Sequence, residues 1–70
     1  MKIYINGSNH TLLENLPTVE HALQHYLSSA QRSSSFAVAV NQAFVSKQAY
    51  ATTTLAEHDA LDILFPIVGG

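Results

Sequence analysis

One amphipathic helix of about three turns lies between stretches whose apolar residues alternate with a period of two, and this limits the folds open to the chain. Thr18 is the predicted N-cap, and Glu20 lies in the first turn, where the helix dipole favours a carboxylate. The apolar face holds Val19, Ala22, Leu23, Tyr26 and Leu27. The polar face holds Glu20, His21, Gln24 and His25. A short helix with one apolar face needs a sheet to cover it.

The alternating stretches supply that sheet. In residues 2–6, Ile3 and Ile5 point to one face while Tyr4 points to the other, and the Asn-Gly pair at 6–7 predicts a hairpin turn into a strand that ends near residue 14. Further strands are predicted at 36–41, at 43–46 after a turn at 41–42, and at 60–68 with Leu61 and Ile63 inward. Pro66 should end regular pairing in the last strand. Residues 28–35 are interpreted as a serine-rich linker, and residues 47–55 are too weakly patterned to assign.

The order of these elements predicts the fold class. It is an α+β fold of the β-grasp (ubiquitin-like) type, with a mixed sheet of four to five strands and one main helix packed on one face. Both the first and the last strand must contact the core, so they should pair as parallel neighbours. We expect residues 1–70 to form one domain with a flexible Gly-Gly tail. The chain has no cysteine, so packing alone must stabilise it, and its apolar content of 47% is consistent with that.

Composition excludes several classes of function. The net charge is −2 and the only cations are Lys2, Arg32 and Lys47, so a nucleic-acid partner is not expected. No apolar run approaches the roughly 18 residues that span a bilayer, and the first residues lack the apolar core of a secretory signal. We therefore expect a cytoplasmic protein without a membrane partner. Charged residues make up only 11% of the chain, which suits docking to another protein.

The residues that could carry catalysis or bind a metal have simpler structural explanations. His21 and His25 are four apart on a helix, as in some metal sites, but they lie on the polar face without a third ligand, so no metal site is predicted. His10 and His58 are expected to be exposed. Glu57 and Asp59 flank a turn, where carboxylates commonly bond the local backbone. No catalytic residue is predicted.

The end of the chain, FPIVGG, is a better candidate for function. A carboxylate becomes an electrophile only after activation, for example as an acyl-adenylate made from ATP, which a sulfur nucleophile or an amine can then attack. Gly69 and Gly70 lack a Cβ and could thread a narrow cleft of a partner enzyme, while the segment from Pro66 to Val68 keeps the stem extended. A merely fraying end would be polar, whereas this one is apolar. The pattern therefore favours a functional tail.

Across nearly all of its length the chain resembles the ThiS-type sulfur carriers of the ubiquitin-like superfamily. The resemblance is carried by KIYING, TVEHALQHYL, AVAVNQAFVSKQAY and LAEHDALDILFPIVGG. Asn41, Val45, Lys47, Tyr50 and Asp59 occupy positions where the family has an Asn, a Val, a basic residue, an aromatic residue and an Asp. The chain departs from the family at two positions: Ser46 stands for the usual proline and His58 for the usual glycine.

The resemblance implies a carrier rather than an enzyme. A ThiF-type adenylyltransferase would use ATP to adenylate Gly70, and a cysteine desulfurase would supply the sulfur that converts it to a thiocarboxylate. A ThiG-type thiazole synthase would then receive that sulfur for the thiazole ring of thiamine. No cofactor would be bound by the carrier itself.

Other functions remain open. The small subunit of molybdopterin synthase (MoaD type) has the same fold and a similar end, and tRNA-thiolation carriers belong to the same superfamily. A β-grasp adaptor would bind partners through its sheet without sulfur transfer. For a carrier, docking should involve the tail and the sheet face away from the helix, where Tyr4, Leu64 and the adjacent Phe65 are the candidates.

Overall fold

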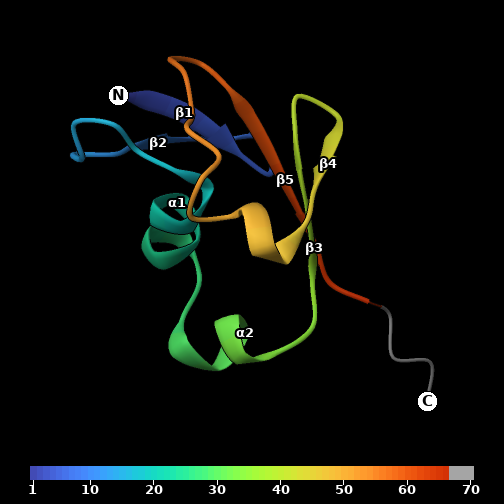
Figure 1. Ribbon diagram of the computed structural model, residues 1–70. Helices are drawn as coiled ribbons and strands as arrows, with labels where there is room; N and C mark the ends of the chain where they lie inside the picture. Colours follow the sequence, from blue (N-terminus) through green and yellow to red (C-terminus); the bar gives the residue numbers. More distant parts are fainter. Residues whose placement is uncertain (67–70) are drawn as a thin grey trace.

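Five short strands form one mixed sheet, and the main helix crosses one of its faces (Figure 1). The computed structural model describes residues 1–66. The strands are β1 (Lys2–Ile5), β2 (Ser8–Thr11), β3 (Ala37–Val40), β4 (Ala43–Val45) and β5 (Ala60–Leu64). The helices are α1 (Val19–Tyr26), α2 (Ser29–Ser33) and a single 3-10 turn (Lys47–Ala49).

The strand order is β2-β1-β5-β3-β4, so the first and last strands lie side by side in the middle of the sheet. The pair of β1 and β5 is parallel, with Tyr4 opposite Ala60 and Ile5 opposite Leu61. The other three pairs are antiparallel. This is the β-grasp arrangement that the order of elements predicts.

Both hairpins turn through residues with positive φ, as two-residue type I′ loops require. Asn6 has φ 49° and Gly7 has φ 84° between β1 and β2. Asn41 has φ 49° and Gln42 has φ 71° between β3 and β4. Gly has no Cβ, and the short side chain of Asn can hydrogen-bond locally in this region, whereas Gln42 has neither advantage. The two predicted turns are therefore confirmed.

Helix α1 begins where the sequence predicts. Thr18 is the N-cap: its hydroxyl accepts a hydrogen bond from the His21 backbone N–H at 3.3 Å, and its own N–H donates to His21 Nδ1 at 3.0 Å. This is a capping box in which histidine replaces the usual Glu or Gln. Val19, Ala22 and Leu23 are buried, as is Leu27 just after the helix.

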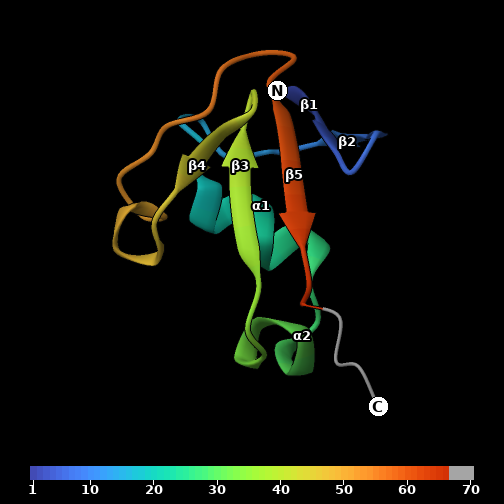
Figure 2. The same ribbon diagram turned by 90° about the vertical axis from the view of Figure 1, so that its right-hand side faces the viewer.

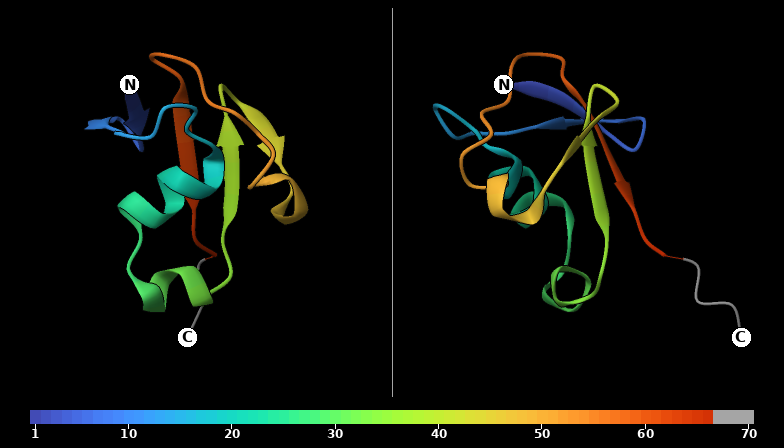
Figure 3. Two further views of the ribbon diagram at one scale, coloured as in Figure 1. Left: turned by 60° about the vertical axis from the view of Figure 1, so that its left-hand side comes forward. Right: turned by 45° about the vertical axis from the view of Figure 1, so that its right-hand side comes forward.

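Helix α1 lies against one face of the sheet (Figure 3), and one cluster of apolar side chains forms the core. The fully buried side chains at its centre are Ile3 and Ile5 from β1, Val38 from β3, Leu61 from β5, and Val19 from α1. The rest of the core is Leu12, Ala22, Leu23, Leu27, Tyr50, Leu55 and Ile63. Within residues 1–66 no helix is long and apolar enough to cross a membrane.

The structure corrects four local predictions. The serine-rich segment contains α2, because Ser28 and Gln31 form a second capping box that starts a short helix. β2 ends at Thr11, since Leu12 turns into the core beneath the helix. The last strand ends at Leu64, two residues before Pro66. Tyr26 is 37% exposed rather than buried, because its ring packs edge-on against His10 at the rim of the core.

Candidate functional site

The strand that leads to the predicted tail, β5, is paired on both sides in the sheet. β5 is hydrogen-bonded to β1 on one side and to β3 on the other, and its inward side chains Leu61 and Ile63 are almost fully buried. β5 ends at Leu64, and the chain continues from its end beside the sheet (Figure 2). Val68, Gly69 and Gly70, the predicted tail residues, lie outside the described residues.

Asn6 extends the pairing of β5 beyond the end of β1. Its backbone N–H donates to the Leu61 carbonyl at 2.9 Å, and its side-chain oxygen accepts from the Ile63 N–H at 2.8 Å. A side chain thus replaces the next backbone acceptor of β1. The sequence predicted Asn6 only as a turn residue, so this contact to the last strand was missed.

An apolar cleft of about 320 Å³ lies beside the exit of the chain from β5. It is lined by Ser35, Phe36, Ala37, Leu64, Phe65 and Pro66. Phe36 links it to the rest of the protein: its ring centroid lies 5.7 Å from that of Phe65 and 6.3 Å from that of Tyr50, with which it stacks. Because β3 runs antiparallel to β5, the residue before β3 arrives beside the end of β5.

Two of the three predicted docking residues, Tyr4 and Leu64, share the open face of the sheet opposite α1, but they do not form one patch. Tyr4 is opposite Ala60, and Leu64 follows four residues later on β5, which separates the two side chains by about 13 Å along the strands. Leu64 is 64% exposed and Tyr4 37%. Phe65, 41% exposed, lies in the cleft against Phe36 instead.

Phe44 is an exposed aromatic residue on the same open face that the prediction omitted. It lies opposite Ala39, whose other neighbour across the sheet is Asp62, and it is 75% exposed. The alternation of Phe44 with half-buried Val45 in β4 already indicated an outward side chain. The open face therefore presents separate apolar groups around one carboxylate.

Glu57 and Asp59 have the predicted structural role, but only Asp59 bonds the local backbone, whereas Glu57 bonds the backbone of β1. Glu57 Oε2 accepts from the Lys2 N–H at 2.9 Å. Asp59 accepts from the Asn41 side-chain amide at 2.9 Å and from the Ala56 N–H at 2.8 Å. Asn41 in turn accepts from the Ala60 N–H at 3.0 Å. The pair of Asn41 and Asp59 therefore joins the β3–β4 turn to the start of β5.

The histidines have structural partners. His21 caps α1 through Nδ1. His10 is half-buried rather than exposed, because it lies on the helix side of β2, with its Nδ1 3.3 Å from His25 Nε2 and its Nε2 buried without a partner. Among residues 1–66 no group of three or more His, Cys, Asp or Glu side chains is placed to hold a metal ion.

Tyr50 is the one tyrosine in the core. Burial raises the pKa of its phenol above the ordinary value, and the nearby carboxylate of Glu20 raises it further. The hydroxyl therefore keeps its proton at neutral pH and can act as a hydrogen-bond donor.

Comparison with known proteins agrees with this architecture. The model of the ThiS family matches residues 3–70. Among solved structures, a thiamine biosynthesis protein (ThiS) from Geobacter metallireducens superposes with a TM-score of 0.77 and 22% sequence identity, covering all of both chains. No curated protein sequence matches. With a five-stranded β-grasp sheet, a central last strand and a family match over nearly its whole length, the chain belongs to the ThiS family.

Proposed function

We propose that the protein is a sulfur carrier whose terminal residue, Gly70, is adenylated and converted to a thiocarboxylate that donates sulfur for the thiazole ring of thiamine. The observation that supports this most strongly is the ThiS-family match, which runs through the final Gly-Gly. The position of β5 adds to it, because the strand that leads to the last residues is held in the centre of the sheet between β1 and β3.

The proposed chemistry has three steps. An oxygen of the Gly70 carboxylate attacks the α-phosphorus of ATP and displaces pyrophosphate, which gives an acyl-adenylate. The terminal sulfur of a persulfide then attacks the carbonyl carbon and displaces AMP. A thiol cleaves the resulting acyl disulfide at the sulfur–sulfur bond, which releases the thiocarboxylate and leaves a disulfide behind. ATP is thus a substrate of the activating enzyme and is not a cofactor held by the carrier.

The partners proposed for this chain follow the same chemistry. A ThiF-type adenylyltransferase would activate Gly70, a cysteine desulfurase would supply the persulfide sulfur, and a ThiG-type thiazole synthase would accept the product. Tyr4, Leu64 and Phe65 are the proposed docking residues, supported by their exposure on or beside the open face of the sheet. Phe44 joins them on the same ground.

Intact mass spectrometry tests the proposal. The protein is incubated with a ThiF-type enzyme, ATP, cysteine and a desulfurase, and the expected product is heavier by the difference between one sulfur and one oxygen atom, mapped to Gly70. A variant with one alanine added after Gly70 should show no gain. If the partner enzymes modify their own carrier while this chain stays unmodified, the carrier function is wrong.

A further inference from the structure

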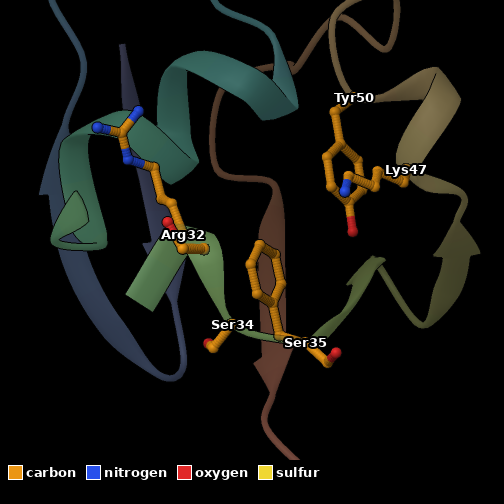
Figure 4. A pocket seen from close by; sticks show the side chains of 7 residues that line it. Arg32, Ser34, Ser35, Lys47 and Tyr50 are labelled. Carbon is orange, nitrogen blue, oxygen red and sulfur yellow. The ribbon is translucent and has the colours of Figure 1, made fainter. Parts of the chain in front are cut away.

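Two of the three cations of the chain line one pocket. Arg32, at the end of α2, and Lys47, at the start of the 3-10 turn, face a cavity of about 310 Å³. Figure 4 shows Arg32 on one side of this pocket, Lys47 and Tyr50 on the other, and Ser34 and Ser35 between them. Within residues 1–66 the only ion pair is that of Glu57 with His58, so neither cation of the pocket is neutralised at close range there.

Two of the hydroxyls that line the pocket have no acceptor among residues 1–66. The hydroxyls of Ser33 and Ser34 bond carbonyls of α2, whereas the hydroxyl of Ser35 forms no hydrogen bond with the described part of the chain. The Tyr50 hydroxyl is also without an acceptor there, and its phenol stays protonated at neutral pH. Among residues 1–66, the carboxylate of Glu20 lines a smaller cavity together with both cations, yet it forms no ion pair with either. Two cations and two available hydroxyl donors beside one carboxylate favour an oxyanion as the ligand of the pocket.

This cationic pocket adjoins the apolar cleft beside the end of β5. Ser35 and Phe36 line both cavities, and Phe36 stacks on Tyr50, which lines the cationic pocket. The cleft reaches Pro66, four residues before the end of the chain. An enzyme that binds the last four residues would lie beside the apolar cleft. Its surface would then extend to the cationic pocket.

We propose that the pocket of Arg32 and Lys47 receives an acidic side chain of the enzyme that activates Gly70. The inference rests on the proposed function and deepens it by assigning an electrostatic contact to the docking of that enzyme. A carboxylate on a protein surface fits better than a free small anion, because the charges lie next to an apolar cleft. Aromatic groups and arginine beside one another are typical of protein interfaces. Exposed cations alone would hold a small anion only weakly against solvent.

The test compares steady-state adenylation by the ThiF-type enzyme for the wild type, the Arg32→Gln/Lys47→Gln double variant, and Gln24→Glu. The control lowers the net charge by one on the exposed side of α1, away from the pocket. We expect KM of the double variant to rise at least tenfold with kcat nearly unchanged, while Gln24→Glu stays within twofold. We also expect the wild-type KM to rise with added salt more steeply than that of the double variant, since surface charges mainly affect association and its salt dependence.

The outcomes are distinguishable. If the wild type is adenylated and the double variant keeps the wild-type KM and salt dependence, the contact is wrong while the carrier function stands. If active partner enzymes leave the wild type unmodified, both proposals fall. Titration with inorganic pyrophosphate, followed by amide NMR shifts, should produce no saturable binding at Arg32 or Lys47. Saturable binding there would overturn the proposal in favour of a small-anion site.

Discussion

His58 is expected to destabilise the protein through its backbone, and replacing it with glycine should relieve this. The residue has φ 68°, in the left-handed region, in the turn before β5. Its backbone N–H donates to the Lys2 carbonyl at 2.7 Å, and glycine would keep that bond. Its imidazole has a single charged neighbour, Glu57, at 3.7 Å, with both side chains more than half exposed, so that pair adds little.

The magnitude follows from two opposing effects. An L-residue in the left-handed region costs about 1–2 kcal/mol, while glycine loses roughly 0.5–1 kcal/mol more conformational freedom on folding. The difference lies between about 0 and 1.5 kcal/mol, and the centre of that range predicts that His58→Gly raises the free energy of unfolding by about 0.5–1 kcal/mol. For a domain of this size, that corresponds to a rise in Tm of about 2–8 °C.

Urea and thermal unfolding, followed by circular dichroism, measure the effect. His58→Ala is the matched control, because it removes the imidazole as glycine does but keeps the Cβ that causes the strain. We expect the urea midpoint to rise for His58→Gly with an unchanged m-value, and to rise less or not at all for His58→Ala. Equal stability of the two variants would refute the backbone argument and assign the effect to the side chain.

Three further substitutions and one control, Asp62→Ala, test other parts of the structure. Thr18→Ala removes the N-cap of α1 and should lower the free energy of unfolding by about 1 kcal/mol in urea unfolding; no change would mean that the capping contacts contribute nothing. Asp59→Ala removes the two oxygens that accept hydrogen bonds from Asn41 and Ala56, and it should lower the free energy of unfolding by about 1–2 kcal/mol. Asp62→Ala removes a carboxylate from the open face and should change that free energy by no more than roughly 0.5 kcal/mol. Leu64→Glu should leave Tm nearly unchanged but raise KM for adenylation; an unchanged KM would remove Leu64 from the docking surface.

Much of the fold could be predicted because its signals are local. Alternation in β1 and β5, the Asn-Gly pair at 6–7 and the Thr18 cap each depend on residues within a few positions of one another. The parallel pairing of the terminal strands also followed, since both carry apolar faces that only a shared core can bury. The α2 helix was missed although its capping box is local, because the surrounding serines favour an irregular segment equally well.

The candidate site was predicted less completely because its geometry depends on register. Alternation assigned Tyr4 and Leu64 to one face but could not show that they lie at different positions along their strands. The position of Phe36 beside Phe65 depends on the antiparallel pairing of β3 with β5, which no local pattern encodes. The partners of Asn6 and His10 were missed for the same reason: each contacts a segment distant in the sequence.

If the protein acts as the proposed carrier, the central position of β5 would let a partner hold the chain end without unfolding the domain. A partner that holds the residues after Pro66 pulls on a strand bonded along both edges, and Asn6 adds a side-chain bond where β1 ends. The inward side chains Leu61 and Ile63 would have to leave the core before the strand could be withdrawn, and truncating even one of them costs about 2–5 kcal/mol. For the proposed carrier, the pairing of β5 and its buried side chains would therefore resist the pull of a partner, and binding energy would go into positioning Gly70 rather than into unfolding the domain.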